Sequence, residues 1–247
     1  MTMSPLSNRV KNSEDLVPGD HIYSWRKLFS YAHHGIFVGE GMVIHFTSGS
    51  ILGISSSSST PGKKTCPYIH PRCGIEQKPG SGVAVTCLAC FERKGSLYRF
   101  EYGVTKIAFK LHLRGGTCTT AESDPKSEVL HRANYLLEKG GFGKYNLFRN
   151  NCEDFALYCK TGLLTIDIDK ASGRSGQIAD LVKMLPKKIK AKYFSHCVGL
   201  GRYGSDVGVR DDVIKVPVED LVADNSTQDD ENDHLQDNDN ATQDDEK

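Results

Sequence analysis

The sequence predicts an α+β fold, with an antiparallel sheet packed against helices. Three features support this prediction: a β-hairpin pattern near the N-terminus, two alternating segments mid-chain, and two helical segments after them. With 247 residues, the chain is long enough for one well-buried domain with extensions. We detect no internal repeat.

The hairpin is predicted over residues 35–46. In "GIFVGEGMVIHF", two runs of β-branched and aromatic residues flank Gly39-Glu40-Gly41. Two registers remain open. A three-residue loop places His33 diagonally beside His45 on one face of the hairpin. A loop of only residues 40–41 slips the register by one and places His34 beside His45 instead.

The middle of the chain predicts an irregular excursion followed by two strands. Residues 48–80 are rich in Ser, Gly, Pro and Cys, which is typical of irregular structure. Apolar residues then alternate in "GSLYRFEYGV" (95–104) and in "KIAFKLHL" (106–113). Each segment therefore predicts a strand with one buried face.

Two helices follow. Ser123-Asp124-Pro125 is a typical helix start, apolar residues then recur at helical spacing, and Gly140-Gly141 ends the run. The second helix is predicted to begin after Asn150-Asn151 and to end at Gly162.

The first residue of the second helix is a cysteine, Cys152. Backbone N–H groups at a helix N-terminus favour a thiolate and can bind an oxyanion, although Glu153 and Asp154 oppose the first effect. A thiol nucleophile also needs a general base, nearly always histidine, and three histidines cluster around the hairpin: His33, His34 and His45. Cys118, in "GGTCTT", is a weaker candidate nucleophile because its motif has no evident helix start or histidine.

A second group of candidate residues lies in and after the excursion. Cys66, His70 and Cys73 precede "TCLAC", in which Cys87 and Cys90 form a C-x2-C pair. Four thiolates, or three with His70 as the alternative ligand, suit a tetrahedral structural zinc ion. The first half has C-x6-C spacing, so free thiols or a disulfide remain alternatives.

Charge is distributed unevenly along the chain. Residues 219–247 contain 12 acidic residues and one lysine, whereas residues 1–218 carry a net charge of +11. The acidic tail is expected to be disordered, and either keeps the protein soluble or masks the basic body from anionic membrane surfaces. We expect no nucleic-acid partner.

No apolar run reaches the roughly 18–20 residues of a membrane span, and the N-terminus lacks a signal-peptide core. We therefore expect a cytoplasmic protein without a transmembrane anchor, whose eight cysteines are reduced, bound to metal or catalytic.

Three ordered motifs resemble the lecithin:retinol acyltransferase-like family, within the broader NlpC-like thiol hydrolases. They are "PGDHI" (18–22), "YAHHGIFVGEGMVIHF" (31–46) and "NNCEDFALYCKTG" (150–162). The likeness is greatest to the plant branch of NC-domain proteins, which also have a Cys-rich insert and "GGTCTTA" (115–121). The resemblance covers roughly residues 17–215.

The resemblance implies a permuted papain-like (NlpC-like) fold. It also implies that Cys152 is the nucleophile, His33 the base and His45 the third polar member of the catalytic group, with Tyr31 helping to stabilise the oxyanion. Asp154 stands where animal members usually have histidine.

The implied activity is acyl transfer or phospholipase-type hydrolysis of lipid esters through an acyl-thioester, with no cofactor required for catalysis. An amidase or peptidase using the same residues is one alternative. A catalytically inactive interaction protein is another. Because animal members tend to carry a C-terminal membrane helix that this sequence lacks, we expect at most peripheral membrane binding.

The expected organisation has four parts. They are an N-terminal extension (1–16), the family-like domain (17–170) with the insert at about 48–94, a basic extension (171–218) and the acidic tail (219–247).

Overall fold

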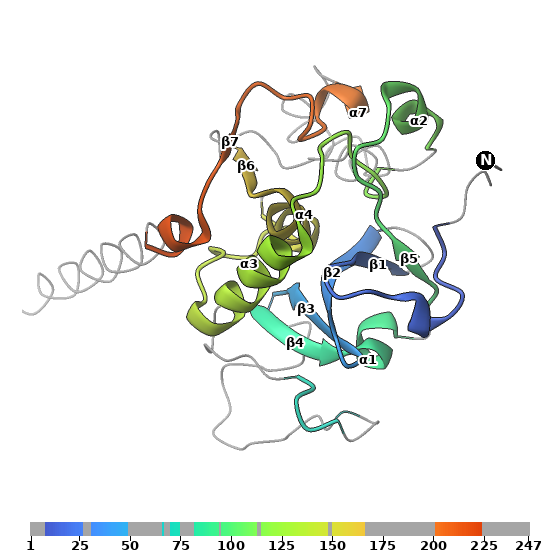
Figure 1. Ribbon diagram of the computed structural model, residues 1–247, viewed down its shortest axis with the longest axis vertical. Coiled ribbons are helices and arrows are strands. Elements are labelled where there is room, and N and C mark those ends of the chain that lie inside the picture. Colours follow the sequence, from blue (N-terminus) through green and yellow to red (C-terminus); the bar gives the residue numbers. More distant parts are fainter. Residues whose placement is uncertain are drawn as a thin grey trace, which may run out of the picture.

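The computed structural model describes nine segments of the chain. These are residues 8–26, 31–48, 66, 70–74, 82–93, 95–112, 115–147, 150–165 and 201–223. Within them, one antiparallel sheet packs against helices on both faces (Figure 1). The predicted α+β class is confirmed.

The sheet has five strands in the order β4-β3-β2-β1-β5, and every neighbouring pair is antiparallel. A short 3-10 helix, η1 (Ser13–Asp15), precedes it. The strands are β1 (His21–Arg26), β2 (Tyr31–Gly39), β3 (Met42–Phe46), β4 (Val83–Cys87) and β5 (Leu97–Arg99). The edge strand β4 lies within the range expected for the Cys-rich insert.

The β2–β3 hairpin combines features of both predicted registers. Its turn is the two-residue loop 40–41, where both residues have positive φ, 51° and 67°. Gly39 pairs with Met42 next to this turn, but the register then shifts and Ile36 pairs with Ile44. The shift restores the alignment of the three-residue-loop alternative, so the hairpin brings His33 beside His45.

The two long helices, α3 (Lys126–Lys139) and α4 (Cys152–Thr161), cover one face of the sheet. Ile36, Ile44 and Phe46 pack there against Phe155 and other side chains of these helices. On the other face, Phe91 of α1 (Leu88–Glu92) packs against Ile22 and Val43.

The ends of α4 are as predicted. The Asn151 side chain accepts hydrogen bonds from the N–H groups of Glu153 and Asp154, and the Asp154 carboxylate accepts one from the Asn151 N–H. This reciprocal capping box fixes the first turn, and Gly162 ends the helix with φ of 69°.

The strand predicted over residues 106–113 is wrong: this segment begins with the helix α2 (Lys106–Leu111). The Thr105 hydroxyl accepts a hydrogen bond from the Ala108 N–H and caps it. Phe109 is buried against Tyr203 of α7 (Gly201–Gly204), with ring centroids 5.7 Å apart. The strand predicted over residues 95–104 is shorter than expected, since β5 covers only Leu97–Arg99.

The C-terminal described segment completes the domain. Its strand β7 (Val213–Lys215) pairs with β6 (Leu163–Thr165), which follows α4. Asp206, fully buried, accepts hydrogen bonds from the hydroxyls of Thr119 and Thr120 and from the Thr120 N–H. The "GGTCTTA" motif therefore binds a carboxylate that lies 86 residues further along the chain.

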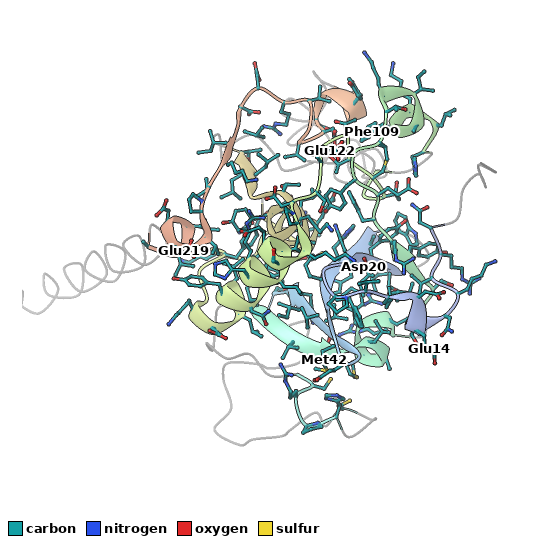
Figure 2. All side chains as sticks on the ribbon, viewed as in Figure 1. Glu14, Asp20, Met42, Phe109, Glu122 and Glu219 are labelled. Carbon is teal, nitrogen blue, oxygen red and sulfur yellow. The ribbon has the colours of Figure 1, made fainter. Side chains whose placement is uncertain are left out.

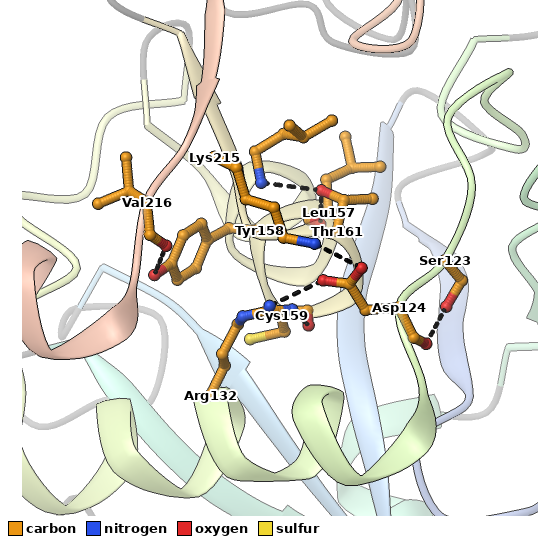
Figure 3. A network of polar contacts seen from close by, with 10 residues as sticks. Ser123, Asp124, Arg132, Leu157, Tyr158, Cys159, Thr161, Lys215 and Val216 are labelled. Atoms are coloured by element: carbon orange, nitrogen blue, oxygen red, sulfur yellow. Dashed lines mark hydrogen bonds and ion pairs between the residues drawn. The ribbon is translucent and has the colours of Figure 1, made fainter.

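A polar network joins α3, α4 and this segment (Figure 3). Asp124 forms ion pairs of 2.7 Å with the buried Arg132 and 2.6 Å with Lys215. Burial alone would raise the pKa of Asp124, but the hydrogen bonds from Lys215 and Arg132 together lower it. Arg132 also donates to the Cys159 carbonyl, so this buried charge has partners on two elements.

Candidate functional site

Cys152 lies at the N-terminus of α4 with its sulfur against the backbone of β2. The thiol donates to the Ala32 carbonyl at 3.9 Å, and the His34 N–H and the Tyr145 side chain form hydrogen bonds to the sulfur. The sulfur thus contacts the two residues that flank His33. Its side chain is buried, with only 2% of the residue exposed.

The architecture of the sheet explains why this strand edge can receive a thiol. The Phe37 N–H donates to the Asp20 carbonyl, so the backbone N–H and C=O groups of Phe37 point toward β1. Because these groups alternate along an antiparallel strand, those of odd-numbered β2 residues face β1 and those of even-numbered residues face the opposite edge. Pairing of β2 with β3 begins only at Ile36. The backbone groups of Ala32 and His34 therefore face the place where β3 diverges, and Cys152 lies there.

The structure brings His33 and His45 together, as predicted. His33 Nε2 lies 3.1 Å from His45 Nδ1, and His45 Nε2 lies 3.2 Å from the Thr86 hydroxyl on β4. The ring of Phe91 packs beside both imidazoles, with centroid distances of 5.3 and 5.7 Å. We refer to His33, His45 and Thr86 as the first histidine network.

A second histidine network begins at the next residue of β2, and sequence reasoning missed it. His34 Nδ1 lies 2.9 Å from His21 Nε2, and His21 Nδ1 lies 2.7 Å from the Tyr102 hydroxyl. Phe100 stacks on the His21 ring, and Tyr23 stacks on the His34 ring. The available signal was His21 itself, within the "PGDHI" motif.

Burial keeps the imidazoles neutral. Desolvation, followed by the charge of the neighbouring histidine, lowers the pKa of His33 and of His21 well below the usual value. Desolvation, with Arg26 and Arg93 nearby, lowers the pKa of His45 to about 3. The rings of His21, His33 and His45 are therefore hydrogen-bonded without charge at neutral pH.

The Cys152 thiol is neutral as well. Burial raises its pKa to about 12, and Glu153 and Asp154 add to this effect, while the hydrogen bonds from His34 and Tyr145 oppose it. The helix N-terminus therefore does not produce a resting thiolate, contrary to the effect expected from its dipole. The Asn151 side chain already takes the N–H groups of Glu153 and Asp154, so neither is available for an oxyanion.

The remaining candidates are placed as follows. In the described part of the chain, no hydrogen bond joins the Cys152 sulfur to the His33 ring. The side chain of Tyr31 and residues 171–200 of the basic extension lie outside what the structure describes. Cys118 is buried and forms an isolated β-bridge to Glu101, and it belongs to none of the described helices.

The Cys-rich segment forms a compact group of sulfur atoms. Cys66, Cys73, Cys87 and Cys90 place their Sγ atoms within 4.8 Å of one another. The predicted alternative ligand, His70, does not belong to this group. The four residues could hold a metal ion.

Comparisons with known proteins agree with the motifs. The family model described as lecithin retinol acyltransferase matches residues 14–165. The chain is 44% identical over 241 residues to Protein LEAD-SENSITIVE 1 of Arabidopsis thaliana. That alignment covers 89% of this chain and 90% of the Arabidopsis protein. It is 25% identical over 193 residues to lecithin retinol acyltransferase of Mus musculus, covering 78% of this chain and 72% of the mouse protein.

The search of solved structures finds no match to the chain. Among the residues that the structure describes, no helix combines the length and the apolar character needed to cross a bilayer.

Proposed function

Because the chain belongs to the lecithin retinol acyltransferase family, we propose that it is a thiol acyltransferase or acyl hydrolase that acts on lipid esters. One observation carries the proposal: the Cys152 sulfur lies on the strand backbone at the residues flanking His33, whose ring is bonded to His45. This contact supports a site in which a thiol, a neutral base and an orienting group act together near the start of β2.

In the first step, His33 removes the thiol proton as the sulfur attacks the ester carbonyl carbon. The proton must move at the moment of attack, because both groups are neutral beforehand. The resulting tetrahedral intermediate then expels the alcohol, which takes the proton from His33. The acyl group remains on Cys152 as a thioester.

In the second step, water or another acceptor attacks the thioester while His33 takes its proton. The intermediate expels the Cys152 sulfur, which recovers a proton from His33. Water gives hydrolysis, and an amine or alcohol gives acyl transfer. The chain's own groups complete this cycle without a cofactor.

One tautomer of the first histidine network suits this role. If His45 Nε2–H donates to the Thr86 hydroxyl, His45 Nδ1 is an acceptor and His33 Nε2–H donates to it. This arrangement leaves the lone pair of His33 Nδ1 as the basic site. His45 would thus act as a positioning residue for His33.

Two tyrosines are candidates for stabilising the oxyanion. Tyr31 is proposed from the family resemblance. Tyr145 is proposed from its geometry, because its side chain already forms a hydrogen bond to the Cys152 sulfur. The family motifs do not include Tyr145, which lies in the middle of the connection between α3 and α4.

The lipid substrate requires access to a membrane surface, and α2 offers one contact. Ile107 and Leu111, one helical turn apart, are 73% and 66% exposed, and Lys106 and Lys110 lie beside them in the sequence. In Figure 2 the labelled Phe109 marks this region at the top of the molecule, opposite Met42 at the start of β3. We include this helix in the proposed membrane contact, together with the net positive charge of the body.

The acidic tail should weaken this contact. Deletion should begin at residue 224, because Val218 is buried and Leu221 and Val222 pack against the core. The shortened protein should bind anionic vesicles more tightly than the full chain and lose that binding in high salt, with neutral vesicles as control. Equal binding of both forms would remove the masking role.

The chemistry is tested by intact-protein mass spectrometry after incubation with mixed phospholipids. We expect an added acyl mass that maps to Cys152 and is absent in Cys152→Ser. Cys159→Ser is a matched control, because Cys159 is buried in the same helix and lies outside the proposed site.

Other outcomes would point to the alternative functions. Turnover of peptide substrates without any acyl-enzyme from lipid would favour an amidase or peptidase. No turnover of either substrate class, with intact fold, would favour an interaction protein.

A further inference from the structure

The four clustered cysteines have the spacing of a tetrahedral metal site. Cys66 Sγ lies 3.6 Å from Cys87 Sγ and 3.5 Å from Cys90 Sγ, and Cys73 completes the group. A disulfide requires a sulfur separation of about 2.05 Å, so these pairs are not bonded. Zinc–sulfur bonds of about 2.3 Å at tetrahedral angles place the sulfurs roughly 3.8 Å apart.

Local structure positions the sulfurs from two sides. Cys87 ends β4 and caps α1, and Cys90 lies on the first turns of α1. Opposite them, the turn containing Cys73 is held to β4 by a hydrogen bond from the Gly74 N–H to the Val85 carbonyl, 2.8 Å. A C-x2-C pair at a strand-to-helix corner thus faces the described part of the insert.

The backbone also directs a donor at one of the sulfurs. The Cys87 N–H lies 3.2 Å from Cys73 Sγ. Such N–H···S bonds stabilise the charge of metal thiolates and fix the orientation of the ligands. The four candidate ligands are therefore accompanied by a backbone hydrogen bond that orients one of them.

We propose that Cys66, Cys73, Cys87 and Cys90 bind one zinc ion as a structural site. Binding converts the four thiols to thiolates, forms four Zn–S bonds and releases up to four protons to solvent, leaving a site with a net charge of −2. The ion fastens Cys66 and the turn containing Cys73 to the β4–α1 corner.

The proposed zinc site includes Cys90 of α1, the helix whose Phe91 side chain packs against the first histidine network. Phe91 follows Cys90 directly and packs on His33 and His45. Arg26 of β1 donates hydrogen bonds to the carbonyls of Phe91 and Glu92. The zinc ion would thus hold α1, and with it Phe91, against the histidines, whether or not the protein transfers acyl groups.

Metal content of the full chain tests the proposal. Protein purified without added metal or immobilised-metal chromatography should contain close to one zinc per chain by elemental mass spectrometry. Cys87→Ser with Cys90→Ser should lose the metal, whereas Cys118→Ser with Cys159→Ser should retain it. His70→Ala should also retain it, which separates four sulfur ligands from three sulfurs and one histidine.

A second measurement covers the case in which the double variant does not fold. Wild-type protein stripped by a chelator should take up one equivalent of Co²⁺ with the visible absorption of tetrahedral cobalt thiolate, and zinc should displace it with release of protons. Folded wild-type protein that neither contains zinc nor shows this spectrum would overturn the proposal. Four cysteines found as disulfides by thiol counting would do so as well.

Discussion

The two histidine networks begin at adjacent residues of β2 but belong to different parts of the molecule. His33 bonds His45 and packs on Phe91 of α1, whereas His34 bonds His21 and lies among the rings of Tyr23 and Phe100. Alternation along a strand sends neighbouring side chains to opposite faces, which separates them.

The comparison shows that a buried, hydrogen-bonded histidine pair does not by itself identify a catalytic base. Each network pairs two imidazoles and ends in a hydroxyl, from Thr86 in one and Tyr102 in the other. Sequence resemblance assigns the base to the first network. The aromatic packing around His34 suits a structural role for the second.

The largest expected difference is between His33→Gln and His34→Gln. His33→Gln should lower the acyl-transfer rate by roughly 10²–10⁴-fold, because it removes the base. His34→Gln should cost about 1–3 kcal/mol in the free energy of unfolding, because it disturbs a buried hydrogen bond, yet change the rate per folded molecule less than tenfold. Rates corrected for the folded fraction, with urea unfolding of both variants, measure this. Equal rate losses at equal stability would assign catalysis to both networks.

Acid sensitivity should also differ between the networks. The pKa values of His33, His45 and His21 are lowered in the folded protein, so below about pH 6.5 the unfolded chain binds protons that the folded protein does not. Stability should be full above this pH and fall by about 1 kcal/mol per pH unit for each histidine, continuing toward pH 3 for His45.

Urea unfolding at pH 7.5, 6.5 and 5.5 measures this dependence. Because the first network supplies two of the three histidines, His33→Gln with His45→Gln should remove more than half of the loss between pH 6.5 and 5.5. The exposed His131 provides a control as His131→Gln. A double variant with the wild-type pH dependence would contradict the assignment of neutral imidazoles to the first network.

Gly35→Ala should damage the first network through packing. A Cβ atom at this position would lie 2.7 Å from Val43 Cγ1 and 3.0 Å from Phe91 Cε2, so the Phe91 ring would have to move. We expect a loss of about 1–3 kcal/mol in unfolding free energy. We also expect a lower acyl-transfer rate. The near-ultraviolet circular dichroism, which reports on tyrosine environments such as those around His34, should stay unchanged. A fully active, equally stable variant would show that the packing of Phe91 against the first histidine network affects neither activity nor stability.

The smallest effects should come from the hydroxyls that end the networks. Thr86→Val and Tyr102→Phe each remove one hydrogen bond to a histidine and should each cost about 1 kcal/mol. Only Thr86→Val should lower the rate, by several-fold, because Thr86 sets the tautomer of His45 and thereby of His33. Thr86→Ser should restore it. A rate loss in Tyr102→Phe alone would reverse the assignment.

The sequence predicted those parts of the site that depend on local patterns. Asn151 and Gly162 mark the ends of α4 because caps act within one turn. The hairpin pattern placed either His33 or His34 near His45, and the family resemblance favoured His33. The segment 106–113 was mispredicted because its four alternating apolar residues, which include Ile107 and Leu111 one helical turn apart, also suit a short helix. The structure buries only Phe109 of Ile107, Phe109 and Leu111.

Features that depend on long-range contacts could not be read from local patterns. The hydrogen bonds from Thr119 and Thr120 to Asp206 join residues 86 or more positions apart. The contact between Cys152 and the β2 backbone spans 120 positions. The high pKa of Cys152 follows from this burial, which no neighbouring residue in the sequence reveals.

The bonds to the C-terminal segment bear on how the protein is made. During synthesis, the sheet, α3 and α4 leave the ribosome before Asp206, Lys215 and Val216, which supply partners for Thr120, Asp124 and Tyr158. A nascent chain that ends after α4 therefore exposes polar groups that the finished protein buries. Folding can become complete only after most of the chain has emerged from the ribosome. Chains that terminate early should therefore be substrates for chaperones and proteases.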